Sequence, residues 1–160
     1  MHPQLRAEGP ETLHVISRAL KTHIDRYEIE RSILMLEEGN NGEAERLFSG
    51  PFKPPERPNP NGWTAPRFHG RALARIKLKR WDAALLDINA AIEAHQWVHN
   101  RKNPCACHLV GELLSKKAMV LDKLGRTQEA QDVRKLAAAA KFNHATSRYG
   151  QLHDRIKAIK

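Results

Sequence analysis

The sequence predicts an all-α protein built from antiparallel helical hairpins. Between Arg71 and His95 the apolar residues fall into two stripes with helical spacing, separated by a short basic turn. Residues 117–140 repeat this organisation. Hydrophobic residues make up 41% of the chain and the mean hydropathy is −0.61, values typical of a soluble protein with many exposed helix faces. We therefore expect one domain made of short helices packed in pairs.

The clearest hairpin begins near residue 67. Its first helix carries Phe68, Ala72 and Ile76 at i+4 spacing, so these side chains share one face. Its second helix is expected to bury one face, because six apolar residues recur at spacings of three, four and seven: Trp81, Ala84, Leu85, Ile88, Ala91 and Ile92. Two short helices with apolar faces and a tight connection pack antiparallel as an αα-hairpin.

This hairpin resembles a tetratricopeptide (TPR) repeat, in which the second helix carries a small residue at the closest helix crossing. The resemblance is carried by Leu78, Trp81, Asp82, Ala84, Asp87, Ala91 and Ile92. In the second copy the equivalent places hold Leu121, Leu124, Gly125, Ala130 and Ala137. Ala72 and Ala118 stand where the family usually has Gly or Ala. Arg75 and Arg134 depart from the family, because large apolar or aromatic side chains normally fill those two places.

The spacing of the copies indicates an irregular array. Ala84 precedes Ala130 by 46 residues, whereas the family period is about 34. The surplus lies in an inserted loop at 95–108, so the two hairpins and this loop span 67–141. A fainter third copy at 32–50 has Ala44 in the equivalent place, and a proline-rich linker at 50–66 separates it from the next. The resemblance implies a short, irregular TPR-like solenoid.

The two ends of the chain complete the predicted organisation. Residues 1–10 are expected to be a flexible N-terminus, and 11–49 to form N-terminal helices that include the possible degenerate repeat. Residues 142–160 read as one helix with a heptad-like seam: Phe142, Ala145, Tyr149, Leu152, Ile156 and Ile159. A capping helix over the exposed end of the stack is the preferred interpretation. The alternative is pairing of this helix with another chain, which would give a homodimer.

Charge and targeting signals restrict the partners and the compartment. The chain has 27 Lys and Arg against 18 Asp and Glu, a net charge of +9, which favours an acidic protein segment, nucleic acid or an anionic membrane surface as partner. No apolar run approaches the roughly 20 residues that cross a bilayer, so no membrane association is expected. The N-terminus has no signal-peptide core, and the expected compartment is the cytoplasm or the nucleus.

One group of residues has the chemistry of a metal site. Zinc binds Cys sulfur and His nitrogen in sets of four, and the inserted loop with its flanks contains His95, His99, Cys105, Cys107 and His108. The spacing does not match the known short zinc motifs. We therefore expect no metal, and interpret the segment as an irregular loop, with metal binding as the alternative.

Function follows from the resemblance, because TPR proteins bind peptides or partner helices in a groove lined by the first helix of each hairpin. Glycine-rich phosphate loops, nucleophile elbows and zinc-protease motifs do not occur, so neither an enzyme nor a cofactor is expected. The expected groove residues are His69, Leu73, Ile76, Lys77 and Met119. A basic row beside them, spaced by four, would bind an acidic segment of the partner: Arg71, Arg75 and Lys79. The predicted function is an adaptor or regulatory subunit, and the alternative is a basic helical protein that binds nucleic acid or a ribonucleoprotein through phosphate contacts.

Overall fold

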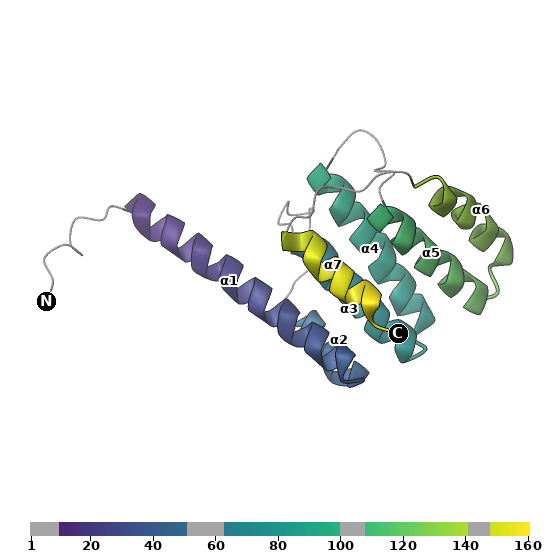
Figure 1. The fold of residues 1–160 in the computed structure, drawn as a ribbon, viewed down its shortest axis with the longest axis horizontal. Coiled ribbons are helices and arrows are strands. Elements are labelled where there is room, and N and C mark those ends of the chain that lie inside the picture. Colours follow the sequence, from purple (N-terminus) through teal and green to yellow (C-terminus); the bar gives the residue numbers. More distant parts are fainter. Residues whose placement is uncertain (1–9, 51–62, 100–107, 141–147) are drawn as a thin grey trace, which may run out of the picture.

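The computed structural model describes residues 10–50, 63–99, 108–140 and 148–160. These residues form seven helices and contain no strand, which confirms the all-α prediction (Figure 1). The helices are α1 (Pro10–Glu37), α2 (Asn41–Ser49), α3 (Thr64–Lys77), α4 (Trp81–His99), α5 (His108–Lys123), α6 (Thr127–Ala138) and α7 (Arg148–Ala158).

The first six helices form three consecutive hairpins, α1–α2, α3–α4 and α5–α6, and each helix packs against the next along the chain (Figure 1). The boundaries differ from the predicted ones at three points. Helix α1 runs unbroken from Pro10 to Glu37, α3 begins at Thr64 inside the expected linker, and α4 continues to His99. The predicted flexible N-terminus, most of the proline-rich linker and most of the inserted loop lie outside the described residues.

The three hairpin turns share one backbone conformation. Gly39, Lys79 and Gly125 each follow the first helix with positive φ values of 78°, 58° and 75°. After each of them, the next backbone N–H donates to the carbonyl five residues earlier, at 2.8 to 2.9 Å, which is the Schellman arrangement of a helix C-terminus. The same turn therefore closes all three hairpins, although only two of them place glycine at the left-handed position.

Small residues allow the helices of each hairpin to approach closely. Ala44, Ala84 and Ala130 each lie five residues after the left-handed turn residue, and all three are fully buried. This confirms the burial expected for Ala84 and Ala130. Gly70 has a related role between hairpins, because a Cβ atom there would lie 2.2 Å from the Phe48 ring. Helix α3 can therefore rest on α2 only while position 70 has no side chain.

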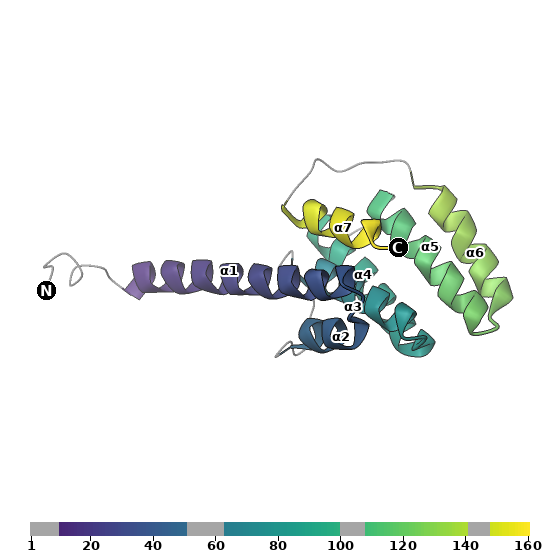
Figure 2. The same cartoon turned by 60° about the horizontal axis from the view of Figure 1, so that its bottom comes forward.

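Helix α7 does not cap the last hairpin. It packs on α3 and α1, and both views place it far from α6 (Figures 1 and 2). Its Leu152 and Ile156 are buried in a cluster formed with α1, α2 and α3. The prediction of a cap after α6 is therefore wrong. The alternative, a homodimer through this seam, has no support in the described residues, because Leu152 and Ile156 are covered by their own chain, while the side chains of Phe142, Ala145 and Tyr149 are not among those described.

Candidate functional site: the inner face of α3 and α5

The same row of positions occurs on the first helices of two hairpins. An offset of 46 residues relates α3–α4 to α5–α6, as the matching Ala84 and Ala130 require. Applied to the predicted groove, it gives three equivalent pairs, each spaced by four along its helix: His69 and Ser115, Leu73 and Met119, Lys77 and Lys123. We call these six positions the inner face.

The α3 half of the inner face is covered by α7. His69 is fully buried, and its Nδ1 lies 2.9 Å from Nδ1 of His153 on α7. Leu73 is buried in the same cluster as Leu152, and the Lys77 ammonium donates a hydrogen bond to the main-chain carbonyl of Lys160. The prediction that His69, Leu73 and Lys77 line an open groove is therefore corrected, because α7 and Lys160 of the same chain cover them.

Helix α7 is held as an amphipathic helix would be held in a groove. Its apolar face, Leu152 and Ile156, faces the cluster that includes Ile33 of α1. At its edge the Arg155 guanidinium donates to both carboxylate oxygens of Glu37, at 3.0 Å each. Figure 2 shows α7 on one side of α1 and α2 on the other, and α7 packs against α1 and α3, the first helices of two of the hairpins.

The α5 half of the inner face is open. Met119 is 39% exposed, and Ser115 and Lys123 are also exposed. The Ser115 hydroxyl donates to the carbonyl of Gly111 one turn earlier, at 2.9 Å, so it is satisfied within the helix. An exposed thioether between a hydroxyl and an ammonium group offers one apolar anchor with polar neighbours. Met119 is the one exposed side chain among the predicted groove residues, and Ile76 is half-buried.

Three buried histidines lie where α7 meets the hairpins. His69, His95 and His153 are buried, and the His69 and His153 rings stack with centroids 5.2 Å apart. His95 meets the edge of His153 at 6.4 Å. Burial, the nearby charge of His153 and that of Lys116 together lower the pKa of His69 well below its ordinary value of 6.5. The contact between the two Nδ1 atoms needs a proton on one of them and a bare nitrogen on the other, so the two rings cannot both be protonated in this arrangement.

The alternative of a metal site finds no support in the described part of the chain. No group of three or more His, Cys, Asp or Glu side chains there is arranged to hold a metal ion. The ring of His95 contacts that of His153. Cys105 and Cys107, and the side chains of His99 and His108, lie outside the described residues, so the alternative that involves them stays a prediction.

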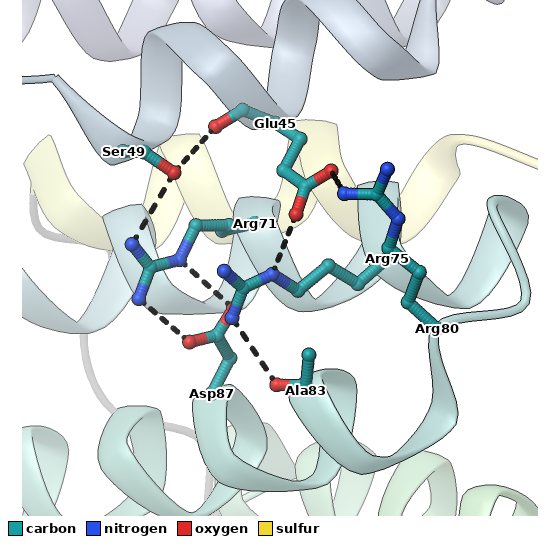
Figure 3. Close-up of polar contacts among 7 residues, drawn as sticks. All are labelled: Glu45, Ser49, Arg71, Arg75, Arg80, Ala83 and Asp87. Atoms are coloured by element: carbon teal, nitrogen blue, oxygen red, sulfur yellow. Dashed lines mark hydrogen bonds and ion pairs between the residues drawn. The ribbon is translucent and has the colours of Figure 1, made fainter.

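The predicted basic row is an internal ion-pair network (Figure 3). The Arg71 guanidinium donates to both oxygens of Asp87, at 2.8 and 2.9 Å. Arg75 donates to Asp87 and to Glu45, at 2.9 Å each, and Arg80 also donates to Glu45. Burial raises the pKa of Glu45, but the hydrogen bonds from the two arginines outweigh this and leave that pKa lowered.

This network corrects the prediction of an acidic-ligand patch. Asp87 is almost fully buried, and the guanidinium groups of Arg71 and Arg75 join α3 to α4 through it, while Arg75 joins α3 to α2 through Glu45. They are therefore not available to a partner's carboxylates. Lys79, the third residue of the row, is exposed, but it forms the turn between α3 and α4. The sequence held one signal for this pairing, because Arg75 occupies a place that large apolar or aromatic side chains fill in the TPR family.

Comparison with known proteins gives no match: no family model, no curated protein and no solved structure is significantly similar to this chain. The TPR resemblance therefore has only the residues and the hairpin geometry to support it. None of the described helices combines the length and the apolar character needed to cross a membrane.

Proposed function

We propose that this chain is a non-enzymatic protein-interaction module, an adaptor or regulatory subunit, whose inner face binds a helical segment of a partner protein. The observation that carries the proposal is the position of α7. An amphipathic helix lies across α1 and α3, with Leu152 and Ile156 inserted and its edges held by polar contacts. The α3 half of the inner face thus already binds a helix, and the equivalent positions on α5 are uncovered.

The open half of the inner face suits a partner helix with an apolar anchor and acidic flanks. Met119 supplies an apolar contact, and methionine adapts its shape to different anchors. Lys123 is exposed one turn further along α5, and the chain as a whole carries a net charge of +9. Such a surface attracts an acidic segment and orients it before contact. The helix-in-groove mode, with anchors spaced by three or four residues, is the matching form of recognition.

Site-specific crosslinking in the native host tests the proposal. A photoreactive amino acid at position 119 is expected to capture one discrete protein, which mass spectrometry identifies. The same amino acid at position 86 is the matched control, because Leu86 is also exposed but lies on α4, outside the inner face. Capture of the same protein at both positions, or at neither, would contradict the proposal.

Charge and anchor variants then test the chemistry with the identified partner. Met119→Glu is expected to weaken binding at least about tenfold, roughly 1.4 kcal/mol, because it removes the anchor and repels acidic flanks. Lys123→Glu is expected to weaken it less, by about threefold, since an exposed charge contributes less than 1 kcal/mol. Leu86→Glu should leave the affinity unchanged. Equal effects of all three variants would refute the assignment of the surface.

The competing function, nucleic-acid binding, has the net charge in its favour. It predicts a different result in the same protein. Binding to generic RNA or DNA would weaken along a straight line of log affinity against log salt, with a slope that counts several phosphates. Such a slope, together with the absence of a protein partner at position 119, would replace the adaptor proposal.

A further inference from the structure

Helix α7 covers the α3 half of the inner face with buried imidazole rings at the contact. His69 of α3 and His153 of α7 are both buried, and their rings stack with centroids 5.2 Å apart. His95 of α4 is also buried and meets the edge of the His153 ring. Histidine is the side chain whose ordinary pKa places its change of charge between pH 5 and pH 8. A helix contact built on such rings can therefore respond to protons.

The distance between the two stacked rings limits how many protons they can hold. Nδ1 of His69 lies 2.9 Å from Nδ1 of His153, a hydrogen bond in which one nitrogen donates and the other accepts. An imidazolium ring carries a proton on both of its nitrogens, so two imidazolium rings would place two N–H groups against each other at this distance. While α7 is in place, the pair therefore holds one positive charge at most.

Even a first proton is unfavourable on His69. Its Nε2 atom is buried and has no hydrogen-bond partner among the described residues, so an imidazolium there would carry an N–H group without an acceptor. Burial is the largest cause that lowers the pKa of His69 well below 6.5, and the positive charges of His153 and of Lys116 on α5 lower it further. The closed arrangement thus opposes protonation at both nitrogens of His69.

The acids on the helices around the pair are exposed or already bound to bases. On α4 and α7 the acids next to the rings in sequence, Glu93 and Asp154, are exposed. Ion pairs engage further acids on α1 and α5: Glu28 and Asp25 with Arg67, at 3.1 and 3.9 Å, Glu37 with Arg155, at 3.0 Å, and Glu112 with Lys116, at 2.7 Å. A carboxylate that faces water or a base compensates a buried imidazolium only weakly.

We propose that α7 is a proton-released cover of the inner face: when His69 and His153 both take up a proton, α7 detaches from α1 and α3 and uncovers the α3 half. After release the two rings are apart and each can be protonated, whereas the closed pair holds one positive charge at most. Release therefore takes up at least one proton below about pH 6.5, the ordinary pKa of histidine. Acid favours release by up to about tenfold per pH unit for each proton, and the closed form is favoured above that pH.

The fold allows α7 to leave alone. It is the last helix of the chain and packs on α3 and α1, while the three hairpins pack against one another without it. Its release uncovers the α3 half, so that the inner face extends over α3 as well as α5 and has room for a longer partner helix. This gain in binding surface rests on the proposed function, whereas the release itself does not.

Hydrogen exchange of the full chain, without any partner, tests the release. An isolated helix of 11 residues is not stable in water, so the amides of α7 exchange once it detaches. After correction for the intrinsic effect of pH on exchange, the protection of α7 is expected to fall at least about tenfold between pH 7 and pH 5. The protection of α6, which lies far from α7 in both views, should fall much less (Figures 1 and 2). Unchanged protection of α7, or an equal loss in α6 that indicates unfolding of the whole protein, overturns the proposal.

Asparagine variants show whether this pair of rings is the sensor. His69→Asn and His153→Asn each keep a polar atom near the place of Nδ1 and remove one titrating ring, so the acid response of α7 should be reduced to about threefold or less. His23→Asn is the matched control, because His23 is exposed on α1 and its replacement should leave the response unchanged. A full response in both variants of the pair refutes the assignment.

The ring of His69 gives a second readout that needs no variant, and it decides the case in which the asparagine variants do not hold α7 in place at pH 7. Protonation of this ring, followed by NMR of its carbon and proton shifts, is expected to have the same midpoint as the loss of α7 protection. If His69 becomes protonated while α7 stays protected, or α7 exchanges while His69 stays neutral, the proposal is wrong.

Discussion

The α3–α4 and α5–α6 hairpins have the same turn and the same small residue at the helix crossing, but their interiors have opposite chemistry. Arg75 and Asp87 face one another inside α3–α4. With the offset of 46 residues, the equivalent places in α5–α6 hold Leu121 and Val133, both buried in an apolar cluster. The two helices of a hairpin therefore adopt the same backbone arrangement whether an ion pair or apolar side chains lie between them. The charged version adds a connection to Glu45 of α2 that the apolar version has no means to make.

The inner faces of the two hairpins also differ, because one is covered by another helix and the other is exposed. On α3, position 73 is a buried leucine under α7, whereas its equivalent on α5 is the exposed Met119. The α3–α4 hairpin is thus covered by α2 and by α7, whereas among the described helices α5–α6 packs mainly against α4. This contrast is the reason why the proposed binding surface lies at α5.

Breaking the charged interior should have the largest effect. Asp87→Ala leaves two guanidinium groups without their buried acid, and removal of one partner from such a network costs about 3–5 kcal/mol. We expect the free energy of unfolding, measured by urea denaturation, to fall by that amount. The matched variant Arg75→Leu/Asp87→Val copies the apolar interior of α5–α6 and should recover more than half of the loss. If the double variant is as unstable as the single one, the two interiors are not interchangeable.

Gly70 and Lys116 occupy equivalent positions, and they should respond differently to the same substitution. Gly70→Ala drives a methyl group against the fully buried Phe48 ring and is expected to destabilise the protein by about 1–3 kcal/mol. Lys116→Ala removes only the partly exposed pair with Glu112 on the same helix, worth about 0.5 kcal/mol or less. Thermal denaturation of both variants checks the difference. A tolerated Gly70→Ala would show that α2 can move away from α3.

Local patterns predicted the hairpins, because helix faces and turns are determined by residues a few positions apart. The stripes around Ala84 and Ala130 identified α4 and α6, and both alanines are buried as expected. The site was less predictable. The apolar spacing in α7 predicts that one face of this helix is buried. It does not predict which helices, distant in the sequence, pack against that face. His69 was therefore interpreted as a groove residue, although His153, 84 positions later, buries it.

The basic row failed as a prediction for a related reason. Periodicity showed that Arg71 and Arg75 share a helix face, but it could not show that Asp87 of the next helix and Glu45 of the previous hairpin face the same side. Helix α1 gives a further example, because Ile16, Leu20, Ile24 and Tyr27 follow one another at helical spacing in the sequence. Only the fold shows that the helix turns a different set of residues, Ile29 and Ile33, towards the core and leaves these four exposed.

The histidine cluster should make the closed half of the inner face sensitive to acid. His69 faces His153 of α7, and the nearby His95 of α4 and Lys116 of α5 add no negative charge that would favour a proton. Its pKa is lowered in the folded state, so the unfolded chain binds more protons below about pH 6.5. The contribution of His69 to the free energy of unfolding is therefore fully present above about pH 6.5. It is lost as the pH falls below that value, by up to about 1.4 kcal/mol per pH unit for one group. His69→Ser, which copies Ser115 of α5, should reduce this slope in urea denaturation between pH 7 and pH 5. An unchanged slope would show that other groups cause the acid sensitivity.

The hairpin turns give the smallest expected difference. Lys79 adopts a φ of 58° where the other two turns have glycine, and the left-handed conformation costs a residue with a side chain about 1 kcal/mol. Lys79→Gly should therefore stabilise the protein by about 0.5 kcal/mol, since the greater freedom of glycine in the unfolded chain offsets part of the gain. Gly125→Lys makes the converse exchange in α5–α6 and should cost about 1 kcal/mol. Because position 79 is exposed and outside the inner face, Lys79→Gly should also leave partner binding unchanged, whereas a role for Lys79 in an acidic-ligand patch would weaken it.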